Sequence, residues 1–176
     1  MNTRIEAKAS AFLAEAGITR PPIPVDVLAR HEGATIRYRN FDGDISGLLL
    51  RTDDEKVIAV HSAHAKVRQR FTIAHELGHL RLHKGRPIIV EQLTRSARVN
   101  WRDDVSSGAT DSEEIDANQF AAALLMPREM IEADYWRLAN AGHLGDDIVA
   151  HLAGRYIVST QAMHFRLLNL ALADPA

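Results

Sequence analysis

The stretch Phe71-Thr-Ile-Ala-His-Glu-Leu-Gly-His-Leu-Arg-Leu-His83 decides the fold, because its apolar residues lie on almost every side of a helix. Such a helix is buried on most sides, so we expect it at the centre of the domain. His75, Glu76 and His79 stand in it as H-E-x-x-H. Four residues are slightly more than one helical turn, so both imidazoles project from one face and can hold one ion at about 2.0 to 2.1 Å. Glu76 lies about 100° further round, too far aside to be a ligand but within reach of a water molecule at the ion.

Two histidines do not complete a catalytic zinc site, which takes three protein ligands. The chain has no cysteine, so the third ligand must be a histidine or a carboxylate. On the next long helix, Glu114, Ala117, Asn118 and Ala121 share one face, and the two alanines let this helix approach the His75 helix closely. We predict Glu114 as the third ligand and Asn118 as a hydrogen-bond partner that orients a ligand.

Other polar side chains compete for roles at this site. His83 follows His79 by four residues, but one helix cannot wrap three such side chains round one ion. We therefore expect His83 at the helix end, where the helix dipole favours it. A tetrahedral oxyanion also needs a second donor, and the candidates are His61, His64, Arg70 and Tyr135.

Outward from this helix, the period of the apolar residues changes along the chain. Alternation predicts strands at 34–39, 45–51 and 57–60, which we interpret as a three-stranded antiparallel meander beside the H-E-x-x-H helix. Residues 94–111 have no clear period and are predicted to form a long loop. Helical periodicity predicts the remaining helices, at 3–16, 25–31, 112–125, 127–140, 145–155 and 160–172. The predicted fold class is α+β and mainly helical.

The composition limits the class of protein. The 176 residues are 46% hydrophobic and 25% charged, which is typical of one ordinary folded domain with a small appendage. Without cysteine, disulfides and thiolate metal sites are excluded. The first residues are polar, and no run approaches about 18 unbroken apolar residues, so we expect neither a signal peptide nor a membrane span and place the protein in the cytoplasm.

The last part of the chain has the period of a helix-turn-helix. We divide the chain into a metal-binding domain, residues 1–126, and a helical subdomain, residues 127–176, that packs on it. The spacing of Leu152, Tyr156, Ser159 and Ala162 leaves DNA binding open as an alternative. Against it, the net charge is −2, and the last 36 residues hold two Arg and three Asp.

Two paired motifs carry a family resemblance. The run from Phe71 to His83, followed by Glu114-Ile-Asp-Ala-Asn118-Gln-Phe-Ala-Ala-Ala-Leu-Leu-Met-Pro127, resembles the ImmA/IrrE family of bacterial metallopeptidases. The resemblance implies a zincin-like fold, with His75 and His79 as metal ligands, Glu76 as general base and Glu114 as acidic ligand. The spacing argument gives the same four roles independently.

The resemblance also implies a function. Members of this family cleave helix-turn-helix repressors of the Xre type and so release phage, mobile-element or stress genes. We therefore expect a zinc endopeptidase with a repressor as its protein substrate; two imidazoles and a carboxylate also suit Mn²⁺. A catalytically idle member, acting by protein binding or as a toxin-antitoxin component, is the other alternative.

Overall fold

The helices and the first three strands agree closely with the periodicity of the sequence, whereas the fourth strand, Ile88–Gln92, is not predicted from it. The structure is a computed structural model that describes residues 3–41, 45–83, 88–92 and 111–173. Its elements are α1 (Thr3–Glu15), α2 (Val25–His31), β1 (Ala34–Arg39), β2 (Ile45–Arg51), β3 (Lys56–His61), α3 (Lys66–Leu82), β4 (Ile88–Gln92), α4 (Asp111–Leu125), α5 (Arg128–Asn140), α6 (Gly145–Tyr156) and α7 (Thr160–Asn169). The predicted mainly helical α+β class is confirmed. The predicted loop at 94–111 lies outside the described residues except for its last position.

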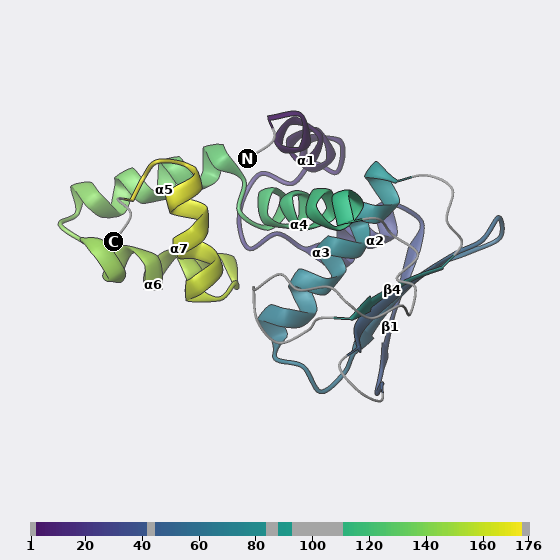
Figure 1. Ribbon diagram of the computed structural model, residues 1–176. Coiled ribbons are helices and arrows are strands. Elements are labelled where there is room, and N and C mark those ends of the chain that lie inside the picture. Colours follow the sequence, from purple (N-terminus) through teal and green to yellow (C-terminus); the bar gives the residue numbers. More distant parts are fainter. Residues whose placement is uncertain (1–2, 42–44, 84–87, 93–110, 174–176) are drawn as a thin grey trace.

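Helix α3 is the central helix, as predicted. It runs between the sheet and α4 (Figure 1), and every residue from Thr72 to Leu80 is buried. The helix begins at Lys66, after Ala65. The hydroxyl of Ser62, just before it, bonds to the side chain of Asn40.

The four described strands form one mixed sheet in the order β1-β3-β2-β4. β1 runs parallel to β3, whereas β2 runs antiparallel to both β3 and β4. The predicted three-stranded antiparallel meander is therefore wrong in strand order, in the direction of one pair and in the number of strands.

The apolar content of the strands explains this order. Leu49 of β2 and Ile58 and Val60 of β3 are completely buried, so these two strands belong inside the sheet. Arg37 and Arg39 of β1 are exposed, which suits an edge strand because charged side chains discourage pairing with another chain. β3 therefore lies between β1 and β2, although β1 and β2 are consecutive in the chain.

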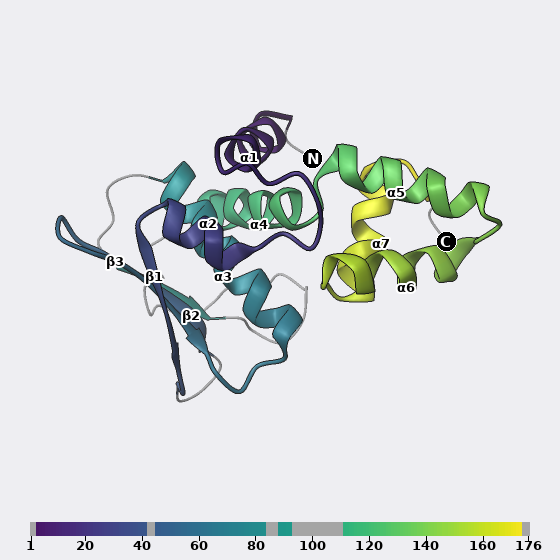
Figure 2. The ribbon, with the colours of Figure 1, turned by 180° about the vertical axis from the view of Figure 1, so that it is seen from behind.

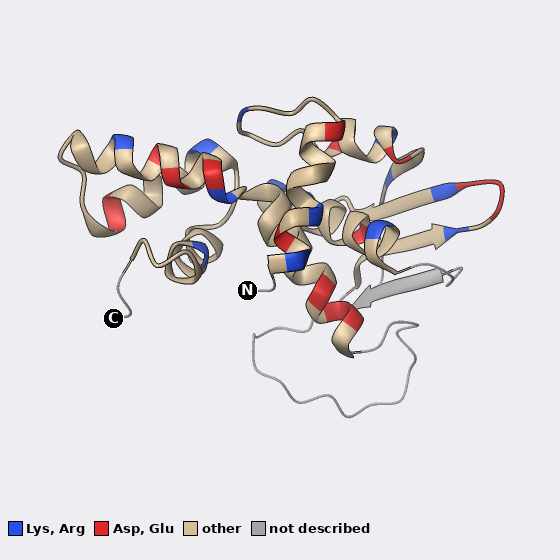
Figure 3. Cartoon of the chain, turned by 90° about the horizontal axis from the view of Figure 1, so that it is seen from above, with Lys and Arg blue, Asp and Glu red and all other residues tan. Residues whose placement is uncertain are grey.

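Helices α3 and α4 approach each other closely at one point. A Cβ atom added to Gly78 of α3 would lie 3.0 Å from Cα and 3.2 Å from the carbonyl oxygen of Ala117 in α4. A side chain at position 78 would crowd the main chain of α4, so Gly78 opposite Ala117 allows the close approach that the sequence predicts. On its other side α4 packs against α1, and Figure 3 shows the acidic residues where α4 begins.

Helices α5, α6 and α7 lie together beside α1, α3 and α4 (Figures 1 and 2). Arg166 of α7 is 1% exposed; its Nε donates to the main-chain oxygen of Met126 at 2.8 Å, and its guanidinium pairs with Glu6 of α1. Arg70 of α3 donates to the main-chain oxygen of Ile157 at 3.2 Å. Buried arginines thus connect the last helices to the rest of the chain, and the predicted boundary after Met126 stays a prediction.

Among the described residues, none of the helices has the length and apolar character needed to cross a lipid bilayer.

Candidate metal centre

The three predicted metal ligands meet between α3 and α4. The Nε2 atoms of His75 and His79 are 2.9 Å apart. One carboxylate oxygen of Glu114 lies 3.1 Å from Nε2 of His75, and the other lies 3.3 Å from Nε2 of His79. Both imidazoles are buried, and the Glu114 side chain is 22% exposed. The chain thus brings together two nitrogens from one helix and a carboxylate from the next.

The spacing of these donor atoms fits a divalent cation. For a tetrahedral zinc ion, bonds of about 2.05 Å place neighbouring ligand atoms about 3.3 Å apart. The observed separations are 2.9, 3.1 and 3.3 Å. His75, His79 and Glu114 therefore form a group that could hold a divalent metal, and its partly exposed carboxylate leaves one side of the group accessible.

The electrostatics of the group favour the protonation states that bind a cation. Burial alone would raise the pKa of Glu114, but the adjacent imidazoles of His75 and His79 outweigh it and lower the pKa to about 2. Burial and the neighbouring His75 lower the pKa of His79 despite the opposing effect of Glu114. Glu114 is therefore an anion and His79 neutral at pH 7, as metal binding requires.

Asn118 lies where the sequence predicts it, one turn after Glu114. Its Oδ1 accepts a hydrogen bond of 3.0 Å from Nδ1 of His75. In a neutral imidazole, a hydrogen on Nδ1 leaves the lone pair on Nε2, the atom that faces Glu114. Asn118 therefore fixes the tautomer and the orientation of His75.

We expect Asn118→Leu to weaken metal binding about 10- to 100-fold, because the leucine cannot accept the hydrogen bond from His75. Asn118→Asp keeps an acceptor oxygen and should retain most of the affinity. Competition with a chelator measures the metal affinity of both variants. Asn169→Leu on α7 is the control, because it places a leucine at an exposed asparagine away from the metal centre. Unchanged affinity in Asn118→Leu would show that the hydrogen bond contributes nothing.

A second chain of contacts supports His79. Its Nδ1 lies 3.2 Å from Nδ1 of His83, and Nε2 of His83 lies 3.9 Å from a carboxylate oxygen of Asp116. Arg51 of β2 donates to the main-chain oxygens of His79 at 2.9 Å and of His83 at 2.7 Å. His83 is the C-cap of α3, as predicted. Arg51 donates to the carbonyl group of His83, and it adds a second hydrogen bond to the carbonyl group of His79, which also accepts from the N–H of His83.

Because Arg51 makes both of these hydrogen bonds, we expect Arg51→Met to lower the free energy of unfolding by about 1.5 to 3 kcal/mol. The metal affinity should fall as well, since the last turn of α3 carries His79. Chemical denaturation measures the first effect and chelator competition the second. Arg37→Met on the exposed edge strand is the control. An equal loss of stability in that variant would mean that the hydrogen bonds from Arg51 to the end of α3 are not responsible.

The side chain of Glu76 leaves α3 on the side of the sheet, whereas His75 and His79 face α4. Glu76 is completely buried and faces β2, where a Cβ atom added to Gly47 would lie 3.5 Å from Oε1 of Glu76 and 2.3 Å from Cγ2 of Thr72. Glu76 follows His75 by one step round the helix, and its role as general base stays a prediction. Gly47 is a site residue that periodicity did not reveal, because its role depends on a contact between a strand and a later helix.

The candidate oxyanion donors lie in different environments. Arg70 donates to the main-chain oxygens of Ile23 at 2.9 Å and of Ile157, so it connects backbone segments. His61 and His64 stack on each other with ring centroids 4.3 Å apart between β3 and α3. Tyr135 is on α5. An oxyanion role for the two histidines or the tyrosine stays a prediction.

The comparisons agree with this geometry. A search of curated proteins gives no match. The family model of the M78 peptidases, described as the IrrE N-terminal-like domain, matches residues 29–168. That range contains the sheet, both helices of the metal centre and most of α7. The chain therefore belongs to the IrrE N-terminal-like family of metallopeptidases.

Proposed function

We propose that this protein is a metal-dependent endopeptidase and that its substrate is a helix-turn-helix repressor of the Xre type. The observation that carries the proposal is the convergence of His75, His79 and Glu114, with a buried Glu76 one step round the same helix. The family match supports peptidase chemistry, and the resemblance of the paired motifs to ImmA/IrrE proteins supports the repressor as substrate.

The residues divide the reaction between them. A bound divalent cation supplies Lewis acidity, which lowers the pKa of a water molecule to about 7 and polarises a carbonyl group. His75, His79 and Glu114 hold that cation, and Asn118 keeps His75 in the binding tautomer. Glu76 accepts the proton of the attacking water as the new C–O bond forms, and then passes it to the nitrogen of the leaving amine as the C–N bond breaks.

The sheet offers a way to bind an extended peptide. Gly47 of β2 lies against Glu76, and β4 pairs with the opposite edge of β2 from β3. Within the described residues β4 pairs on one side only, so a peptide could join the sheet there as a further strand. A repressor would then have to present a flexible segment, and we expect cleavage outside its rigid helices.

Direct DNA binding has less support. Helices α6 and α7 have the shape of a helix-turn-helix, with Ser159 accepting a hydrogen bond from the N–H of Ala162. However, Arg166 is buried and Arg155 pairs with Asp134 at 2.6 Å, so the two arginines of these helices are already engaged. Figure 3 shows acidic as well as basic positions on the C-terminal helices. A surface that reads DNA needs an excess of positive charge.

The test is to incubate the Zn²⁺-loaded protein with a small Xre-type repressor encoded beside its gene and to resolve the products by mass. We expect two fragments whose masses sum to that of the repressor plus one water. Stable association without cleavage would support the idle regulator instead. A gel shift whose affinity falls steeply with salt would support DNA binding.

A further inference from the structure

We propose that His143, Asp147 and His151 form a second binding site, for a divalent transition-metal ion, on the surface of the C-terminal helices. His143 lies in the connection between α5 and α6, and the other two residues lie on α6. Among the described residues, this group and the candidate metal centre are the two sets of three side chains placed to hold one ion. The two sets share no residue, and this proposal is independent of peptidase activity.

The connection between α5 and α6 brings His143 back over α6. Gly142 and Gly145 adopt positive φ angles of 91° and 50°, which glycine tolerates without strain. Between them, the N–H of His143 donates to the main-chain oxygen of Leu138 at 3.1 Å, so the turn is fixed to the end of α5. A flexible loop would not hold His143 in one place.

The donor atoms are already close together. Nδ1 of His143 contacts one carboxylate oxygen of Asp147, and Nδ1 of His151 lies 3.1 Å from the other. The two imidazole rings have centroids 4.6 Å apart. One donor atom of each side chain lies within 4.8 Å of the other two, so a metal could bind all three with small side-chain rotations.

The charges around the group also suit a cation. The N-terminus of a helix carries a partial positive charge, but Asp146 and Asp147 place two carboxylates in the first turn of α6. Nδ1 of His151 also lies 2.8 Å from the main-chain oxygen of Asp147, so the ring lies over the same face of α6, and an ion would take the place of the hydrogen on Nδ1.

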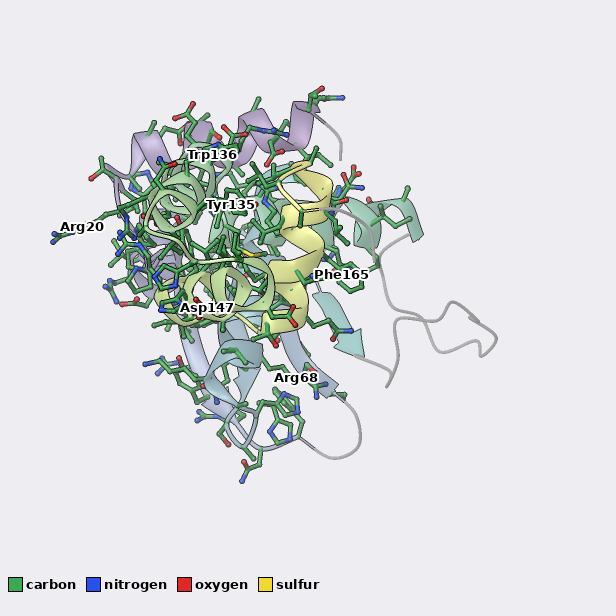
Figure 4. All side chains as sticks on the ribbon, turned by 90° about the vertical axis from the view of Figure 1, so that its left-hand side faces the viewer. Arg20, Arg68, Tyr135, Trp136, Asp147 and Phe165 are labelled. Atoms are coloured by element: carbon green, nitrogen blue, oxygen red, sulfur yellow. The ribbon has the colours of Figure 1, made fainter. Side chains whose placement is uncertain are left out.

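The ligand set indicates the class of ion. Two imidazoles and one carboxylate favour Zn²⁺, Co²⁺, Ni²⁺ or Cu²⁺, whereas Ca²⁺ and Mg²⁺ prefer sites built from oxygen alone. The side chains of His143, Asp147 and His151 are 33%, 53% and 49% exposed, and Figure 4 shows Asp147 on the face turned to the viewer. An ion can therefore reach the group from solution.

The alternative is that Asp147 makes two surface ion pairs and binds no metal. Equilibrium dialysis of the full chain against Zn²⁺ separates the two. We expect wild-type protein to bind one more equivalent than Asp147→Asn or the double variant His143→Ala/His151→Ala. The matched control His164→Ala on α7 should bind as much as wild type. Circular dichroism checks that each variant is folded. Of the two site variants, Asp147→Asn changes the shape of the side chain less.

Nuclear magnetic resonance of the imidazole nitrogens gives a second measurement on the wild-type chain. Added Zn²⁺ should shift the ring signals of His143 and His151 and leave those of His164 in place. Equal zinc binding by the double variant and wild type would overturn the proposal. So would an equal loss in His164→Ala, because it would indicate adventitious binding by surface histidines.

Discussion

The Glu76→Gln protein is expected to keep its metal and to lose cleavage by about 10²- to 10⁴-fold, the usual contribution of a general base. Glutamine has nearly the same shape as glutamate, so the contact with Gly47 is preserved. The amide cannot accept the proton of the attacking water. Metal analysis of the purified protein and the initial rate of repressor cleavage measure the two effects separately.

Glu113→Gln is the matched control for this substitution. Glu113 is half-buried and adjoins the ligand Glu114 in sequence, but it is not part of the His75, His79 and Glu114 group. The control should keep both metal and activity. Full activity in Glu76→Gln would remove Glu76 from the reaction, and a loss of metal in that variant would make it a ligand.

Replacing Gly78 by valine is expected to damage both the fold and the metal centre. A Cβ atom there already lies 3.0 Å from Cα of Ala117, and valine adds two methyl groups. The main chain of α4 must move away, and it carries Glu114 with it. We expect the free energy of unfolding to fall by about 1 to 3 kcal/mol and the metal affinity to fall with it. Denaturant titration and chelator competition measure these quantities.

Gly154→Val on α6 is the control, because a Cβ atom at Gly154 meets nothing within 4 Å outside the local helix. At Gly154, in the interior of α6, the change to valine should alter the free energy of unfolding by only a few tenths of a kcal/mol. If Gly78→Val kept the stability and metal affinity of wild type, close packing of α3 on α4 would not position Glu114.

The metal group could be predicted from the sequence because it depends on helical periodicity. A spacing of four residues places His75 and His79 on one face of α3, and the alanine face of α4 indicates how Glu114 reaches them. The same reasoning predicted Asn118, which lies one turn after Glu114 on the same face of α4 and, like Glu114, contacts His75. These are local patterns on two helices that pack together.

The sheet and the supports of the site could not be predicted in the same way. Strand order depends on which strands bury most of their apolar residues, and β1 is separated from β2 by a strand that follows both in sequence. Arg51 reaches the carbonyl group of His79, 28 residues further along the chain. Gly78 occupies a position that the H-E-x-x-H pattern leaves free, so its fit against Ala117 appears only when the two helices are packed.

Anomalous diffraction from crystals grown with Zn²⁺ tests the central claim most directly. We predict a peak about 2.0 to 2.2 Å from Nε2 of His75, Nε2 of His79 and a carboxylate oxygen of Glu114. Well-ordered crystals without a peak at this position, or with an ion bound there by the two histidines while Glu114 points away, would contradict the account.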